Sequence, residues 1–563
     1  MSEKTVSKLF PIALVTVLTT VFAAECVMNL TPPISRDALI HHLAIPKLWL
    51  KHGGFYEIPW AKYSYYPMNI DLLYLAALYL GNDVAPKFIH WAFGLGTAFL
   101  VYTYIKPRLG TAWGLLAVTI FATTPIIVRL STCAYVDLGL CFFLTAGVLS
   151  FVAWRNGLYQ QPKWLVVSAA CTGLALGCKY NALVGAAFLN LMVVYYYAKD
   201  TKKQTRAVLA GLAFFALSAF VASPWYMKNW LLTGNPFYPL FRGVFGAADN
   251  HHSATALMTQ TGSGLFEKRH LMFGETFTET LLIPIRMFFE GRDDAYRYFD
   301  GVLNPVLILF LPFSFIYRQA GKDRLLFLSF SLFAILSTFF LTRQQVRYMV
   351  FALPFLSILA VMGIKSLFCW ILLPALQNPS KDKKRRLYRP HTALRATAGA
   401  ILSAGIAMLL VPNVTYLKNR FDSLDPIGFI RTGQNRKEFL RRHLASYPAI
   451  EFINAQAPST AKVLMMFVGN RGYYLDRPYV HDRNFGMETL GRLVASSRDD
   501  KAFRSGLESL DCRYVLVRDD LFGKYLADNF DQARLRRFLD LKNRYWSPVY
   551  HSRGFTVYDL KLA

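Results

Sequence analysis

The sequence predicts an α-helical polytopic membrane protein with a small C-terminal α/β domain. Of its 563 residues, 54% are hydrophobic and the mean hydropathy is +0.29, which is too apolar for a soluble protein of this length. Apolar runs of membrane-spanning length recur as far as residue 417, and about 11 of them fit a bilayer. Beyond that point the chain becomes charged and carries short strand-like runs. We therefore expect a membrane domain over 1–418 and an extracytoplasmic domain over 419–563.

The expected spans follow one another closely. They lie at 9–29, 84–105, 111–128, 135–154, 164–179, 182–198, 206–223, 301–318, 324–341, 348–372 and 396–417. The first run follows lysines, as a signal peptide does, but it is long enough to remain as the first transmembrane helix. The run at 68–81 is too short to span and carries Asp71, so we expect an interfacial or re-entrant helix there.

Basic residues set the expected topology. With the N-terminus inside, alternate loops are rich in lysine and arginine, as the positive-inside rule requires of cytoplasmic loops. These loops carry Lys106 and Arg108, Arg155 and Lys163, 199–206, 318–324 and 380–395. Topology thus explains the net charge of +27 without a nucleic-acid partner. The same assignment places the loops 31–67 and 225–300 and the C-terminal domain on the outer side, which is the periplasmic side of a bacterial inner membrane.

The C-terminal domain has its own patterns. Residues 437–457 follow a charged helical pattern, and strand-like runs lie at 462–468, 514–518 and 555–558. Gly469-Asn470 and Arg553-Gly554 are typical of turns. The only cysteine there is Cys512, so an internal disulfide in this domain is excluded.

The first outer loop carries the first candidate for chemistry, Asp37. Pro32 and Pro33 end the preceding helix, Ser35 is a suitable N-cap, and an amphipathic helix follows as far as Gly53-Gly54. The helix dipole keeps a carboxylate in the first turn ionised, which suits a proton acceptor but equally fits a purely structural role. His41 lies one turn further on the same face. Adjacent histidines point about 100° apart on a helix, which argues against a metal site at His41-His42.

Asp137 is the second candidate acid. It lies near the outer end of a span, where an ionisable residue is costly and usually functional. The structural alternative is a local ion pair with Arg129.

Cations of the outer junctions form the third group. Lys179 and Tyr180 occupy a tight turn between two spans, and Arg343 and Arg347 lie at another junction. The positive-inside rule does not explain arginines at an outer junction. A guanidinium group binds phosphate through two hydrogen bonds. We expect these side chains to hold an anionic lipid head group, with simple anchoring at the membrane interface as the alternative.

The sequence lacks the common motifs for nucleotide binding, metal-dependent proteolysis, serine hydrolysis and paired-cysteine chemistry. The sequence has no Walker A or dinucleotide-binding glycine pattern, no HExxH, no GxSxG and no paired CxxC. Energy for a transfer on the outer side would then have to arrive on a lipid.

Five segments, in order, resemble the GT-C superfamily of polyprenyl-phosphate-sugar-dependent glycosyltransferases, which includes protein O-mannosyltransferases and the lipid A aminoarabinose transferase. They are SRDALIHHLAIPKLW with the Tyr66-Pro67 pair, YVDLGLCFF, GLALGCKYNAL, SPWYMKNWLLTGNPFYPLF and RQQVRYMVFALPFL. The resemblance implies a GT-C-like fold, a catalytic aspartate at Asp37, a second acid at Asp137 and a donor-binding lysine at Lys179. It also places Tyr66 in the substrate site. Relatives often have an acid pair where this chain has Arg36-Asp37, so no cofactor is expected and the metal requirement stays open.

The expected function is transfer of a sugar, with inversion, from a polyprenyl-phosphate donor to a glycan, lipid or protein acceptor on the outer face. Asp37 would be the general base, and membrane lipids would surround the site. Two alternatives are a lipid-sugar transporter, whose charges should lie near the midplane of the membrane, and a non-catalytic envelope assembly protein, which would not need Asp37.

Overall fold

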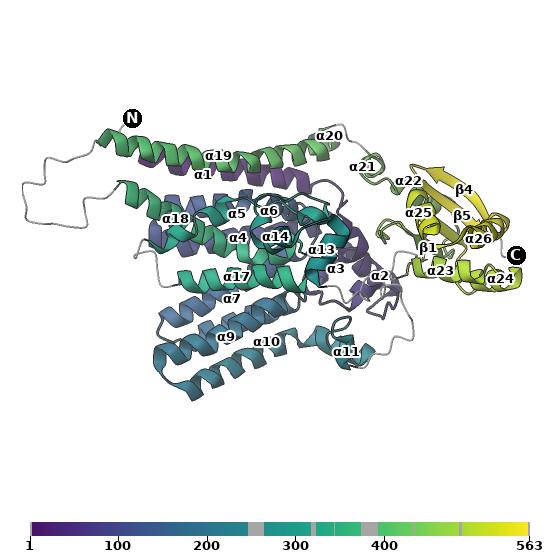
Figure 1. Ribbon diagram of the computed structural model, residues 1–563, viewed down its shortest axis with the longest axis horizontal. Helices are drawn as coiled ribbons and strands as arrows, with labels where there is room; N and C mark the ends of the chain where they lie inside the picture. The colour runs from purple at the N-terminus through teal and green to yellow at the C-terminus, as the bar shows by residue number, and fades with distance from the viewer. Residues whose placement is uncertain are drawn as a thin grey trace, which may run out of the picture.

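Long helices packed side by side make up most of the protein, and a mixed α/β domain caps one end of them (Figure 1). The computed structural model describes residues 3–245, 264–316, 323–342, 344–372, 392–431, 433, 435–482 and 487–560. The long helices are α1 (Glu3–Asn29), α4 (Ala85–Leu109), α5 (Thr111–Thr123), α7 (Asp137–Asn156), α8 (Pro162–Leu176), α9 (Ala182–Thr201), α10 (Gln204–Thr233), α17 (Arg324–Leu341), α18 (Leu353–Leu372) and α19 (Thr392–Leu424). Shorter helices lie between them: η1 (Ala38–His42), α2 (Ala44–His52), η2 (Lys62–Tyr65), α3 (Asn69–Tyr79), α6 (Pro125–Ser131), α11 (Arg242–Phe245), α13 (Leu265–Phe273), α14 (Phe277–Leu281), α15 (Ile283–Arg286), η3 (Tyr296–Tyr298), α16 (Val306–Leu309), η4 (Pro312–Phe315) and η6 (Val346–Ala352).

Among the described residues, 8 helices are long and apolar enough to cross a membrane, or 9 if the bent pair α5–α6 is one span. The chain is therefore an integral membrane protein, with fewer full-length spans than the 11 expected. The run 164–179 forms only the 15-residue helix α8, which begins at Pro162 and covers about 22 Å, against the roughly 30 Å of a bilayer core. The run 301–318 is broken into α16 and η4 at Pro312, since proline cannot continue a helix. Residues 68–81 form the short helix α3, as expected.

The loops that the sequence analysis expects on the cytoplasmic side lie at one end of the bundle. The start of α1 and the start of α19 lie at the end opposite the C-terminal domain (Figure 1). Basic side chains of the expected cytoplasmic loops lie at that end, where Arg155 donates to Asp200 at 2.8 Å. Residues 380–391 of the basic run lie outside the described residues.

The C-terminal domain contains a five-stranded sheet in the order β2-β1-β3-β5-β4. Strands β1 (Val463–Met466), β2 (Tyr479–Val480) and β3 (Tyr514–Arg518) are parallel, whereas β5 (Phe555–Leu560) is antiparallel to β3 and to β4 (Trp546–Ser552). The helices are α20 (Pro426–Arg431), α21 (Arg436–His443), α22 (Tyr447–Gln456), α23 (Met487–Ser496), α24 (Asp500–Glu508), α25 (Asp519–Asn529) and α26 (Gln532–Tyr545). The three expected strands are confirmed, and β2 and β4 are additional.

Two details refine the sequence-based boundaries. Positive φ angles at Arg553 and Gly554 confirm the expected turn, which joins β4 to β5. The expected boundary between residues 418 and 419 is wrong, because α19 continues to Leu424 before the chain enters the domain.

The C-terminal domain rests directly on the first loop. The Tyr473 N–H donates to the carbonyl of Leu39 at 3.2 Å, and the Tyr474 hydroxyl donates to the carbonyl of Pro33 at 2.7 Å. Lys47 of α2 pairs with Asp476 at 2.8 Å. The 31–67 loop and the C-terminal domain therefore lie on the same side of the bundle.

We expect this side to face outward. In a background that lacks the native cysteines, a membrane-impermeant maleimide added to intact cells should label Ser423→Cys and spare Lys203→Cys at the opposite end. Both positions are exposed, so access depends on the side of the membrane. Labelling of Lys203→Cys alone would invert the orientation, and labelling of both would add a crossing between them.

Candidate active site

Asp37 lies where the chain enters a single wide helical turn. Pro32 to Ser35 are irregular, and the turn opens when the Leu39 N–H donates to the Ser35 carbonyl at 3.2 Å. The Ser35 hydroxyl does not cap this helix as expected but donates to the Cys133 sulfur at 2.9 Å. The turn η1 is of the π type, which is common at functional sites. It orients Asp37 so that its N–H donates to the Tyr135 hydroxyl at 3.2 Å.

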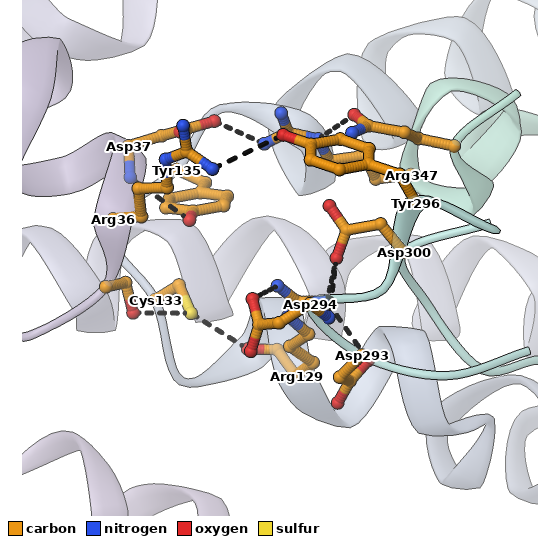
Figure 2. Close-up of polar contacts among 12 residues, drawn as sticks. Arg36, Asp37, Arg129, Cys133, Tyr135, Asp293, Asp294, Tyr296, Asp300 and Arg347 are labelled. Atoms are coloured by element: carbon orange, nitrogen blue, oxygen red, sulfur yellow. Dashed lines mark hydrogen bonds and ion pairs between the residues drawn. The ribbon is translucent and has the colours of Figure 1, made fainter. Parts of the chain in front are cut away.

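The Asp37 carboxylate forms an ion pair with Arg347, whose guanidinium comes from the start of η6 (Figure 2). The two side chains are 17% and 18% exposed, so water still reaches the pair. Burial raises the pKa of Asp37, but the charge of Arg347 outweighs it and holds that pKa well below its usual value. Asp37 is thus ionised and is a weak base while Arg347 holds it.

A second ion pair joins Asp137 at the start of α7 to Lys179, with 2.8 Å between Oδ1 and Nζ. Asp137 is 1% exposed and Lys179 is 15% exposed. The alternative partner considered for Asp137 is wrong, because Arg129 pairs with Asp293 and Asp300, at 3.0 Å each.

Two tyrosines that the sequence analysis did not single out contact these pairs, and one of them, Tyr348, connects the two. The Tyr348 ring contacts both cations, with its centroid 5.1 Å from Lys179 Nζ and 5.3 Å from the guanidinium carbon of Arg347. The Tyr135 ring lies 5.8 Å from the same guanidinium carbon. Each tyrosine is adjacent or nearly adjacent in sequence to a candidate residue, and that proximity was the only available signal.

The histidines after Asp37 point inward. His42 Nδ1 and Asp71 Oδ1 are 2.7 Å apart, and both side chains are buried. Burial lowers the pKa of His42 and raises that of Asp71, so the pair favours a neutral state that holds one proton. The His41 ring packs between His42 and Tyr63, with centroid distances of 4.0 and 4.4 Å.

Tyr66 and Tyr180 belong to a neighbouring aromatic cluster, where their rings meet edge to face at 5.2 Å. The Tyr180 hydroxyl donates to the carbonyl of Tyr238 at 2.8 Å and accepts from Asn229 at 2.9 Å. These bonds give Tyr180 a structural role beside the ion pairs. Arg343 lies outside the described residues.

The 264–300 part of the second outer loop covers one flank of the site (Figure 2). Arg129 anchors it through the two aspartates named above, and Arg36 donates to the Tyr296 hydroxyl at 3.3 Å. The Val346 N–H donates to the Phe299 carbonyl at 2.9 Å, which fixes the backbone just before Arg347.

Metal ligands do not gather here. Within the described ranges, no group of three or more His, Cys, Asp or Glu side chains is placed to hold a metal ion. The acids next to Asp37 are engaged by arginine, lysine or histidine instead.

Comparison with known proteins gives a consistent picture of the fold. The family model for dolichyl-phosphate-mannose-protein mannosyltransferase matches residues 73–227. Two crystal structures of ArnT from Cupriavidus metallidurans are similar to this chain at 14% identity. The structure bound to undecaprenyl phosphate has a TM-score of 0.52, with 100% of this chain and 99% of that chain covered, and the apo structure has 0.54, with 98% of each covered.

A search of curated protein sequences finds no significant match. The structural likeness extends over the membrane part and the C-terminal domain together. The chain thus has the GT-C fold that its motifs resemble.

The buried pair of Asp137 and Lys179 should contribute strongly to stability. Asp137→Ala leaves a lysine without its counter-charge in a mostly buried position, a change that typically costs about 3–5 kcal/mol. We expect a clear drop in the thermal unfolding midpoint in detergent. The double variant Asp137→Leu/Lys179→Met should regain part of the loss, because it removes both charges. Equal midpoints for the wild type and Asp137→Ala would show that the pair adds no net stability.

Proposed function

We propose that this GT-C-fold protein is a glycosyltransferase that takes a sugar from a polyprenyl-phosphate donor and passes it to an acceptor on the outer face. The observation that carries the proposal is the pairing of a buried acid and a half-buried acid with two cations around Tyr348. Such a site offers both a proton acceptor and phosphate ligands. The ArnT structure bound to undecaprenyl phosphate supports the donor class, since its fold extends over the whole of this chain.

In this proposal, Arg347 and Lys179 bind the donor phosphate. Both carry fixed positive charge at the same end of the bundle, and both lie against one aromatic ring. Arg347 supplies a fork of N–H groups that matches phosphate oxygens. The polyprenyl chain would lie along the helices, in the apolar environment that they share with membrane lipids.

Donor binding would also activate Asp37. When the phosphate engages Arg347, the guanidinium no longer neutralises Asp37 fully, and the phosphate charge raises the carboxyl pKa further. The acceptor oxygen then bonds to the anomeric carbon while Asp37 accepts the proton of that acceptor group. The bond between that carbon and the phosphate oxygen breaks, and the polyprenyl phosphate leaves with the electron pair of this bond. The configuration at the anomeric carbon is inverted. Asp137, which is paired with Lys179, would help to orient the donor phosphate through that lysine.

The location of the charges favours an enzyme over a transporter. The two ion pairs lie at the bundle end beneath the C-terminal domain, on or next to helix ends. A transporter would place its charges near the membrane midplane, on discontinuous helices. The C-terminal domain, which contacts the Asp37 loop, would help to select the acceptor.

Asp37→Asn should lower turnover by about 10²–10⁴, because the amide keeps the shape but cannot accept a proton. The assay is sugar transfer in detergent or nanodiscs at matched protein concentration, with donor binding measured separately and retained. Asp37→Glu should keep some activity only if the longer side chain still reaches the acceptor oxygen.

Glu57→Gln is the matched control for Asp37→Asn. It removes another carboxylate from the same loop, one that accepts from the Tyr65 hydroxyl at 2.5 Å, and should leave turnover nearly unchanged. Near-normal turnover by Asp37→Asn would refute the base assignment and direct attention to Asp137.

Arg347→Ala should weaken donor binding more than Arg347→Lys does, because lysine keeps the charge but loses the bidentate fork. Titration of the purified variants with a donor analogue measures this difference directly. Equal affinities for the wild type and both variants would leave Arg347 with an anchoring role only.

A further inference from the structure

A pocket of about 300 Å³ opens beside the Asp37 segment, apart from the two ion pairs described above. It lies where the chain leaving α1 meets the start of α4, the end of α6 and the last turns of α19. Its lining residues are Thr31, Pro32, Ile34, Ser35, Lys87, Thr132, Asp293, Tyr416, Asn419, Arg420, Ser423, Leu424 and His443. Helix α19 has 33 residues and is about 50 Å long, so its final turns extend beyond a bilayer core of roughly 30 Å.

Positive charge dominates this pocket. Lys87 is only 3% exposed, and its ammonium donates to the Met28 carbonyl at 3.2 Å and to the Thr31 hydroxyl at 3.3 Å. Arg420 donates to the Thr132 hydroxyl at 3.1 Å. In the part of the chain that the structure describes, neither cation has a carboxylate within ion-pair distance, because the nearby Asp293 and Asp83 pair with other arginines.

The single carboxylate among these lining residues is already neutralised. Asp293 accepts from Arg129 at 3.0 Å (Figure 2). It also accepts from the Tyr416 hydroxyl at 2.5 Å. His443 adds a buried Nε2 atom that has no hydrogen-bond partner among the described residues. One cavity thus has a buried lysine, an arginine and an unsatisfied imidazole nitrogen in its lining. Such a lining favours a ligand that is an anion and accepts hydrogen bonds.

The pocket is next to the proposed site of transfer. Ser35 lines it and lies two residues before Asp37. The Ser35 hydroxyl donates to the Cys133 sulfur at 2.9 Å, and an Arg420 nitrogen lies 3.8 Å from the same sulfur. Ser35 thus belongs both to the lining of the pocket and to the segment that carries Asp37.

We propose that this pocket binds a phosphoryl group carried by the molecule that receives the sugar, at a distance from the group that reacts. The inference rests on the proposed function, since it assigns a chemical class to the acceptor of that reaction. A phosphoryl group fits better than a carboxylate, because its several oxygens can accept from both cations and from the exposed Ser423 hydroxyl. The volume accommodates a phosphoryl group together with part of the sugar or glycerol to which it is attached.

The test measures binding rather than transfer, so it stands or fails separately from the proposed function. Full-length protein in phosphatidylcholine nanodiscs is titrated with inorganic phosphate, followed by ³¹P NMR line broadening. All variants carry Arg347→Gln, which weakens phosphate binding at the donor site, and every comparison is made within this background. Added Arg420→Gln should weaken phosphate binding roughly tenfold, as expected for the loss of one charge-assisted contact.

Two further variants complete the comparison. Lys418→Gln removes a cation from the same helix that is 72% exposed and paired with Asp422, and it should have no effect. Ser423→Trp adds bulk at an exposed position of the pocket lining and should weaken binding even if Arg420→Gln impairs folding. Loss of all phosphate binding with Arg347→Gln alone, or equal binding with and without Arg420→Gln and Ser423→Trp, would overturn the proposal.

Competition then identifies the source of the phosphoryl group. Phosphatidic acid added to the nanodiscs should displace inorganic phosphate if the acceptor is a membrane lipid, and glucose 6-phosphate should displace it if the acceptor is a soluble glycan. Failure of both to compete would refute a site for a substituted phosphoryl group.

Discussion

The ion pair between Asp37 and Arg347 is the interaction on which the rest of the site depends. Its partners are 310 residues apart in the chain, so it forms only when the first loop and the start of η6 meet above the bundle. One hydrogen bond holds each of these two segments in place. The Asp37 N–H donates to the Tyr135 hydroxyl, and the Val346 N–H donates to the Phe299 carbonyl. The pair keeps a half-buried carboxylate ionised, and the same guanidinium is the natural ligand of a donor phosphate. In the proposed function, this one contact would couple stability, donor binding and the protonation state of the base.

The C-terminal domain completes this arrangement from the outside. The Asp37 loop is held on one face by the helical bundle and on the other by backbone and side-chain contacts from the segment around Tyr473 and Asp476. Trp60 of the same loop packs edge to face on Tyr479 and His481. In the proposed function, a domain that contacts the acid-bearing loop would restrict which acceptors reach it, and the pocket beside Ser35 would recognise a phosphoryl group on them.

The sequence indicated individual charged residues of the site more reliably than it indicated their ion-pair partners. Hydropathy predicted the helical fold, and strand-like runs predicted the three main strands, because both depend on local pattern. The same reasoning selected Asp37, Asp137, Lys179 and Arg347 one by one, since buried charges are unusual wherever they occur. It could not pair them, and it gave Asp137 the wrong alternative partner, because ion pairing depends on tertiary distances. The number of full-length spans is lower than expected because of a break at a proline and one short helix. Mean hydropathy does not detect either feature.

The most direct test of the coupling between donor and base is the pH dependence of transfer. In the free protein Arg347 holds the pKa of Asp37 low, so kcat/KM for the donor should persist to acidic pH. In the donor complex that pKa rises, so kcat should fall at a higher pH on the acidic side. The account predicts two separated acidic limbs in the wild type and the loss of this separation in Arg347→Gln. Coincident limbs in the wild type would contradict it.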